Sequence, residues 1–328
     1  MARAWIAGTG AYLPAKVLTN FDLEKMVDTS DEWITQRTGI RERHIAADDE
    51  AVSDLVIKAS RPAMAMAGAV PQDIDAVIIC TITPDNNFPS TACWVQKGLG
   101  LRAGIPAFDI SAACSGFLYG LIVADSLIQT GGAKCVLLAG AEILSRITNW
   151  TDRNTCVLFG DGAGVTIVTP SPDPRRGLVA SCWHADGNLG DLLVQPAGGS
   201  RLPASAETVA GRLHTIHMSG NEVFKHAVRA MAQAAETVLA EAQVSPADVK
   251  LFVPHQANIR ILEATCQRTG IPLERTVLAI DRIGNVSAAT IPIGLDMSNR
   301  EGKISTGDAV LFDAFGGGFT WGAALMRW

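Results

Sequence analysis

Long apolar runs are missing from this chain of 328 residues, although 48% of its residues are hydrophobic. No stretch reaches the roughly 18 apolar residues that a transmembrane helix needs, so none is predicted. Charged residues are also scarce, at 18%, and the net charge of −6 argues against wholesale nucleic-acid binding. The composition instead predicts a globular chain with a large buried core.

Paired cysteines are the second absence. The seven cysteines are scattered, and no two of them form a C-x-x-C pair. This pattern argues against structural zinc and against a disulfide framework, and it fits a reducing cytoplasm. Gly8 and Gly10 also come too early for a signal peptide, so a cytoplasmic protein is expected.

What the chain does contain is an alternation of strand-like and helix-like runs, which predicts an α/β fold. Residues 75–80 and 136–140 are typical of buried strands. A long amphipathic helix is predicted to begin at Ser219, where the sequence resembles a capping box.

The two halves of the chain also resemble each other weakly. Residues 71–79 have an echo at residues 246–253, and a glycine followed by a strand-like run comes about 60 residues after each. A turn of small residues that opens a helix lies between the members of each pair. We therefore predict two duplicated halves, residues 1–170 and 171–328, with the boundary in a proline-rich segment.

Cys114 lies on the small-residue turn of the first half. A strand-like run, residues 105–110, precedes it, and an apolar-periodic helix follows, so the thiol is expected at a helix N-terminus. The helix dipole and free backbone N–H groups there favour a thiolate and can hold an oxyanion. Most free cysteines are instead buried structural residues, so other segments must decide between the two interpretations.

Three segments of the second half favour a reactive thiol. Asn285 lies on the turn that the repeat places opposite the Cys114 turn, and His255 ends a strand-like run that should face the same cleft. Gly316–Gly318 lie between aromatic residues and permit close approach of backbone to a ligand. A thiol, an imidazole, a carboxamide and the backbone N–H of Gly317 are thus expected to converge.

These segments resemble the beta-ketoacyl-acyl-carrier-protein synthase III branch of the thiolase-fold condensing enzymes. The resemblance runs essentially end to end, and it is carried by residues 20–34, 37–43, 88–90, 112–116, 159–164, 253–258, 281–287 and 315–322. It implies a thiolase-like fold of duplicated α/β halves in an α-β-α-β-α arrangement. It also implies an acyltransferase that initiates fatty-acid synthesis.

The resemblance implies a role for each member of a Cys-His-Asn set. Cys114 would accept the acyl group of an acyl-coenzyme A, with acetyl-coenzyme A the expected primer, and the N–H groups of Cys114 and Gly317 would form the oxyanion hole. His255 and Asn285 would donate hydrogen bonds to the malonyl thioester on acyl-carrier protein while carbon dioxide leaves, which requires a proton on Nε2 of His255. This ping-pong reaction needs no metal and no further cofactor.

The family also implies binding sites and a homodimer. The residues that match its coenzyme A and pantetheine contacts are Trp33, Arg37, Arg153, Asn221, Phe224 and Asn258. A basic patch for the acidic carrier protein would contain Lys225, Arg229 and Arg260. The acyl pocket would contain Leu144 and Phe88, and Phe88 would cross the dimer interface.

Two departures from the family pattern affect the expected primer. Asn154 stands where relatives often have glycine, and the loop from Leu193 to Leu213 is longer than in many of them. The sequence leaves open a related synthase that primes or acylates in a polyketide or other specialised pathway, because that chemistry uses the same three side chains. Papain-like thiol hydrolases share the Cys-His-Asn order, but their local cysteine signature is absent here.

Overall fold

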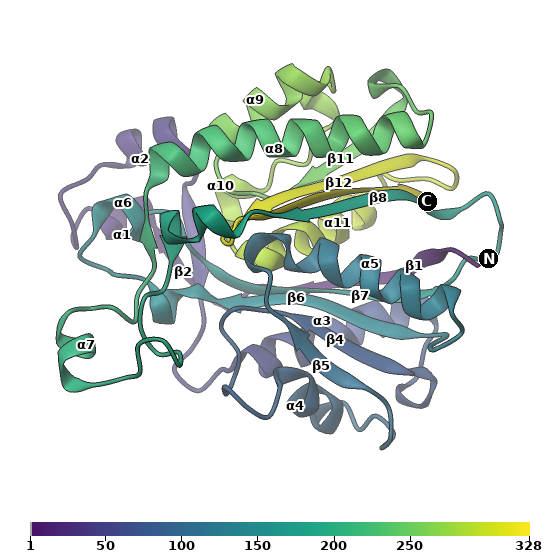
Figure 1. Cartoon of the computed structure of the whole chain (residues 1–328), viewed down its shortest axis with the longest axis horizontal. Helices are drawn as coiled ribbons and strands as arrows, with labels where there is room; N and C mark the ends of the chain where they lie inside the picture. The colour runs from purple at the N-terminus through teal and green to yellow at the C-terminus, as the bar shows by residue number, and fades with distance from the viewer. Residues whose placement is uncertain (1) are drawn as a thin grey trace.

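Two β-sheets frame the molecule in the computed structural model, which describes residues 2–328 (Figure 1). The first sheet has five strands in the order β1-β7-β6-β4-β5. Their bounds are Ala4–Tyr12 for β1, Ala76–Cys80 for β4, Ala107–Ile110 for β5, Val136–Ile143 for β6 and Asp161–Pro170 for β7. Strand β4 runs parallel to both β5 and β6 and is buried throughout, which explains its uninterrupted apolar sequence.

The second sheet has four strands in the order β11-β12-β13-β8. Their bounds are Gly177–Ala185 for β8, Val249–Pro254 for β11, Ala309–Gly316 for β12 and Thr320–Arg327 for β13. Strands β11 and β12 are parallel, as β4 and β6 are. The place that β5 takes beside β4 is held here by one parallel bridge between Phe252 and Thr276. Each sheet therefore repeats the other, and each takes its strands from one side of residue 170.

Helices form three layers around the two sheets, which gives the expected α-β-α-β-α arrangement (Figure 1). The outer layer on the first sheet contains α3, Val52–Ala67, and α4, Thr91–Gly98. The middle layer contains α5, Gly116–Gln129, and α11, Thr290–Arg300. The outer layer on the second sheet contains α8, Gly220–Glu241, and α9, Ile259–Thr269.

The amphipathic pattern of each outer helix explains its place. Helix α3 buries Val52, Leu55, Val56, Ala59 and Ala63, whose spacing places them on one face. Full burial of each valine or leucine side chain contributes about 1.5–3 kcal/mol. Helix α8 begins where the sequence predicts, but the capping-box prediction was wrong, because the Ser219 side chain makes no capping hydrogen bond.

The middle layer joins the two halves. Phe117 and Leu121 of α5 share one buried cluster with Ile291 and Leu295 of α11 and with strands of both sheets. The two small-residue turns that precede α5 and α11 are therefore held beside this buried cluster. In residues 2–328, no helix combines the length and apolarity that crossing a bilayer requires.

Shorter elements surround this frame at the left edge of Figure 1, and one of them, α7, lies on a protruding loop. Their bounds are Lys16–Thr19 for β2, Asn20–Leu23 for α1, Asp31–Thr38 for α2, Glu42–Ile45 for β3, Arg153–Cys156 for α6, Leu193–Val194 for β9, Ala206–Ala210 for α7, His217–Met218 for β10 and Ile280–Ile283 for α10. The loop predicted at residues 193–213 contains β9 and α7.

Candidate active site

Cys114 lies on a tight turn between β5 and α5, as the sequence predicts. We call residues 112–116 the Cys114 elbow, and its strained point is Ala113, whose φ of 45° lies in the left-handed region. Two hydrogen bonds fasten the elbow to β13. Ser115 Oγ donates to the Thr320 carbonyl at 2.9 Å, and Thr320 Oγ1 donates to the Ala112 carbonyl at 3.0 Å.

Gly316 is the residue that lets β12 pass directly beside the nucleophile. A Cβ atom added there would lie 2.6 Å from the backbone nitrogen of Cys114, which no side chain can tolerate. Gly317 follows at once and is half-buried. The role of its N–H in an oxyanion hole stays a prediction. Its neighbour Gly316 lies directly against Cys114.

Burial controls the protonation state of the Cys114 thiol. It raises the pKa of the thiol to about 12, while Ser287 acts in the lowering direction and the Glu142 carboxylate acts in the raising direction. The expectation that the helix N-terminus favours a thiolate is therefore not met in the resting site. The thiol carries its proton at neutral pH and must lose it during any acyl transfer.

A second elbow, residues 286–290, lies between α10 and α11 and has nearly the same backbone. The Ser287 elbow has φ of 45° at Ser287, the value found at Ala113, and the preceding residues share a ψ of 31°. The two elbows touch, because a Cβ added at Gly116 would lie 3.4 Å from the Cβ of Ala288. This contact brings the two halves of the chain to one site, as the repeat predicts.

Asn285 stands directly before the Ser287 elbow and is buried. Its Oδ1 accepts a hydrogen bond from the Ser287 backbone N–H at 2.9 Å, and its own N–H donates to the Leu158 carbonyl at 2.8 Å. These bonds fix the side chain so that the Nδ2 group is the one left to donate to a ligand.

His255 follows β11 and is only 1% exposed. Its backbone N–H donates to the Asp313 carbonyl at 2.8 Å, and Nδ1 lies 2.7 Å from Oγ1 of Thr290 on the Ser287 elbow. Burial lowers the pKa of the imidazole to about 3, so the ring is neutral. A proton on Nε2 then requires the Thr290 hydroxyl to donate to Nδ1 rather than to the Ser287 carbonyl at 3.0 Å.

Three residues of this site were not identified from the sequence. Thr290 binds the His255 ring, Ser287 and Glu142 act on the thiol, and all three are buried. Gln256 was also missed as a brace, since its side chain bonds the backbone of residues 254, 277 and 279. The repeat that located Asn285 also covers Ser287 and Thr290, but their hydroxyls carry no signal of their own.

The predicted nucleotide contacts lie together at the surface. The guanidinium of Arg153 on α6 lies 4.8 Å from the centre of the Trp33 ring, and that of Arg37 lies 5.6 Å from it. Trp33 and Arg37 share α2, as expected, but Arg153 is the closer stacking partner. Asn154 bonds the Asp152 side chain through both its backbone and its amide nitrogen.

The predicted channel and docking residues lie on α8 and α9, which pack together. Arg260 covers the Phe224 ring at 5.6 Å, and Asn258 caps α9 while its Nδ2 donates to the Arg37 carbonyl at 3.0 Å. Lys225 is exposed and pairs with Glu222 at 2.7 Å. Asn221 and Arg229 are exposed on α8 and complete this face.

The two predicted acyl-pocket residues differ sharply in exposure. Leu144 is buried and packs with Phe159 and Ile216, and Leu193 of the long loop covers this cluster. Leu193 also lies against Gly317, since a Cβ added at Gly317 would lie 3.3 Å from its carbonyl oxygen. Phe88 is 86% exposed in the single chain.

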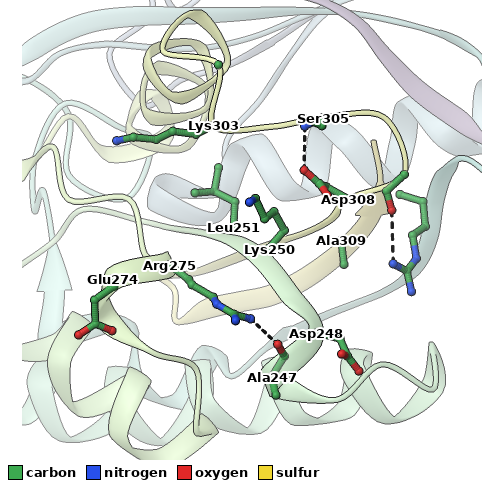
Figure 2. Close-up of a pocket in the computed structure, with 13 residues that line it drawn as sticks. Ala247, Asp248, Lys250, Leu251, Glu274, Arg275, Lys303, Ser305, Asp308 and Ala309 are labelled. Atoms are coloured by element: carbon green, nitrogen blue, oxygen red, sulfur yellow. Dashed lines mark hydrogen bonds between the residues drawn. The ribbon is translucent and has the colours of Figure 1, made fainter.

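A cleft of about 610 Å³ at the far end of the second sheet is an alternative location for an active site (Figure 2). It opens where β11 and β12 begin, whereas His255 follows the end of β11. Its polar groups hold loops together, because Arg275 donates to the Val249 carbonyl at 3.0 Å and Asp308 accepts from the Ser305 N–H at 2.8 Å. Its lining residues include no cysteine and no histidine, so the elbows remain the candidate active site.

Two families of sequences match the chain. The family described as 3-oxoacyl-[acyl-carrier-protein (ACP)] synthase III matches residues 108–187, and the one described as its C terminal matches residues 239–328. The first range contains Cys114, and the second contains His255 and Asn285.

Whole-length relatives agree. The beta-ketoacyl-[acyl-carrier-protein] synthase III of Caldanaerobacter subterraneus subsp. tengcongensis is 52% identical over 325 residues, which cover 99% of this chain and 98% of the relative. The crystal structure of 3-oxoacyl-[acyl-carrier-protein] synthase III from Aquifex aeolicus VF5 has a TM-score of 0.91 at 49% identity and covers 99% of this chain and 100% of that one. The priming beta-ketosynthase from the R1128 polyketide biosynthetic pathway has a TM-score of 0.90 at 32% identity and covers 99% of this chain and 96% of that one. The chain therefore belongs to the beta-ketoacyl-[acyl-carrier-protein] synthase III family of thiolase-fold condensing enzymes, which are acyltransferases.

Proposed function

We propose that this enzyme condenses an acyl-coenzyme A primer with malonyl-acyl-carrier protein and releases a 3-ketoacyl-acyl-carrier protein. The observation that carries this proposal is the meeting of the two elbows. They bring a thiol, a neutral buried imidazole and an oriented carboxamide to one place. A nucleophile beside two hydrogen-bond donors suits acyl transfer followed by enolate formation.

In the first half-reaction, Cys114 Sγ attacks the carbonyl carbon of the acyl thioester and coenzyme A leaves. The elbow N–H of Cys114 and the N–H of Gly317 hold the oxyanion. In the second half-reaction, Nε2 of His255 and Nδ2 of Asn285 donate to the malonyl thioester carbonyl. Loss of carbon dioxide then leaves an enolate that attacks the acyl-Cys114 carbonyl, which completes a ping-pong cycle.

Coenzyme A would enter past Trp33 and Arg153. An adenine ring that stacks on both needs about 7 Å between them, because each aromatic contact takes about 3.5 Å. The guanidinium now lies 4.8 Å from the centre of the Trp33 ring, so Arg153 must move aside when the nucleotide binds. The exposed basic residues Lys225, Arg229 and Arg260 then border the route by which a carrier protein would deliver malonate.

Initiation of fatty-acid synthesis, with acetyl-coenzyme A as the primer, is the pathway that we favour. The Caldanaerobacter and Aquifex relatives are 52% and 49% identical to the chain, and the polyketide priming synthase is 32% identical, although another crystal structure of a 3-oxoacyl-(acyl-carrier-protein) synthase III is itself only 33% identical. Leu144, the residue expected in the acyl pocket, is buried in a cluster against which Leu193 packs. The exposed Phe88 side chain would be covered in a homodimer.

A panel of acyl-coenzyme A primers, each offered with malonyl-acyl-carrier protein, tests the proposal. Mass spectrometry of the carrier-bound product should reveal a 3-ketoacyl chain with acetyl as the preferred primer. A preference for long or branched primers would favour the specialised pathway. Turnover with malonyl-coenzyme A but not with malonyl-acyl-carrier protein would contradict the carrier-dependent reaction.

A further inference from the structure

Glu142 is a fully buried carboxylate behind the Cys114 elbow, and the reaction described above leaves it without a role. It accepts hydrogen bonds from Thr83 Oγ1 at 2.5 Å, from Thr81 Oγ1 at 3.2 Å and from the Ile82 N–H at 3.2 Å. Among residues 2–328, no lysine or arginine forms an ion pair with it. Burial of an uncompensated carboxylate is expensive, which makes its position significant.

The strand that carries Glu142 directs it at the two elbows. Gly140 lies two residues earlier on the same face of β6, and a Cβ added there would lie 2.1 Å from the Ala288 carbonyl oxygen. Glu142 therefore faces the Ser287 elbow from the neighbouring position.

Ser287 belongs to the elbow that packs against both the Glu142 strand and the Cys114 elbow, because its neighbour Ala288 lies against Gly140 and Gly116. Its hydroxyl is buried and makes no hydrogen bond of ordinary geometry in the resting site. It nevertheless lies close enough to lower the pKa of the Cys114 thiol and that of Glu142. Its backbone is held in place, because its N–H donates to Asn285 Oδ1 at 2.9 Å, whereas its hydroxyl is not held. The hydroxyl is therefore free to align with both groups when substrate binds.

We propose that Ser287 and Glu142 form a proton relay that accepts the thiol proton of Cys114 during acylation. As Sγ bonds to the acyl carbon, the thiol proton moves to Ser287 Oγ and the Ser287 hydroxyl proton moves to Glu142. The bond from the acyl carbon to the sulfur of coenzyme A then breaks, and the leaving thiolate takes back a proton along the same route. The step needs no other reactant, and it rests on the acyl transfer proposed above.

Charge conservation explains why such a relay suits this site. If the thiol lost its proton to solvent while Glu142 was ionised, two negative charges would share one buried site. Transfer to Glu142 keeps a single negative charge and only moves it onto the sulfur. Cys80 is also near Glu142, and burial raises the pKa of its thiol, so it stays neutral. Burial also raises the pKa of Glu142 to about 7, a suitable value for a proton acceptor at neutral pH.

The test is the pH profile of Cys114 acylation in a single turnover, read by intact mass. In the unaltered enzyme the rate should rise with pH as Glu142 ionises and should level off above about pH 7. In Glu142→Gln the rate at pH 7 should fall by about 100-fold, and it should then rise tenfold per pH unit without levelling off. A purely structural role would lower the rate at every pH and leave the plateau in place.

Ser287→Ala provides a second variant that keeps the carboxylate. Alanine tolerates this backbone, because Ala113 adopts the same φ of 45° in the other elbow. The variant should also slow acylation and lose the plateau. Ser60→Ala is the matched control, since Ser60 is a buried serine whose hydroxyl donates only to the Val56 carbonyl of its own helix.

A plateau near pH 7 in both variants, or wild-type acylation rates in either, would overturn the relay. The same profiles should be measured with p-nitrophenyl acetate, which acylates a thiol without a coenzyme A site. If the unaltered enzyme accepted no acyl-coenzyme A, the proposed function would fail, and these ester profiles would still decide whether the relay exists.

Discussion

The two elbows have the same backbone and different chemistry. Each places a left-handed residue, Ala113 or Ser287, before a short helical turn, and each faces a glycine of the neighbouring sheet. The Cys114 elbow carries the thiol at the position where the Ser287 elbow carries Ala288. The Ser287 elbow is instead flanked by Asn285 and Thr290, which supply or orient hydrogen-bond donors. The two halves thus contain two equivalent turns, and in the proposed mechanism one carries the nucleophile while the other supports it.

The largest expected effect comes from moving the thiol between the elbows. Cys114→Ala should abolish acylation by acyl-coenzyme A, because it removes the thiol that lies against Gly316. Cys114→Ala combined with Ala288→Cys should stay inactive, since position 288 faces Gly140 instead. Intact-mass measurement after exposure to acetyl-coenzyme A reads both results. Acylation of the double variant at position 288 would mean that backbone alone defines the nucleophile site.

Substitutions beside the Ser287 elbow should affect only the second half-reaction. His255→Ala and Asn285→Ala should each acylate normally and should decarboxylate malonyl thioester about 10²- to 10³-fold more slowly, because each removes one donor to the developing enolate. Acylation by mass and release of carbon dioxide separate the two steps. Condensation at the wild-type rate in either variant would remove that residue from the proposed mechanism.

The repeat explains how much of this site could be predicted from the sequence. The order of strand-like runs and turns located Cys114, His255 and Asn285, because backbone periodicity survives duplication even where residues diverge. Glu142 escaped notice because β6 is otherwise an apolar buried strand, and one acid in it gives no sign of which face it occupies. The raised pKa of the thiol was also missed, since burial depends on packing from both halves.

Substitution of the glycines that face the elbows should lower the stability of the fold. Gly140→Ala and Gly316→Ala should each destabilise the fold by about 1–3 kcal/mol, because the new methyl group meets backbone atoms at 2.1 Å and 2.6 Å. Chemical denaturation measures the change, and Gly199→Ala is the control, because nothing lies within 4 Å of a Cβ added there. A large loss of stability in only one of the two variants would show that the two elbows do not pack equally closely against their glycines.

The smallest expected effect concerns pH and has opposite signs for two groups at the site. The folded pKa of His255 is about 3, so between that value and its unfolded pKa near 6.5 only the unfolded chain binds the proton. His255 therefore lowers stability on acidification by at most about 1.4 kcal/mol per pH unit. The pKa of Glu142 is raised to about 7, so its proton uptake stabilises the fold as pH falls toward its unfolded value of 4.5.

Denaturation midpoints between pH 7 and pH 5 separate these two contributions. Relative to the unaltered enzyme, His255→Gln should gain stability on acidification, and Glu142→Gln should lose it. Above about pH 8, the free energy of unfolding of each variant should change with pH as it does in the unaltered enzyme, because neither group titrates there in either state. If stability changed with pH in the same way in both variants, either His255 would not be buried as a neutral imidazole or Glu142 would not have a raised pKa. Opposite slopes would show that the imidazole of one half is neutral at neutral pH while the carboxylate of the other half titrates near pH 7.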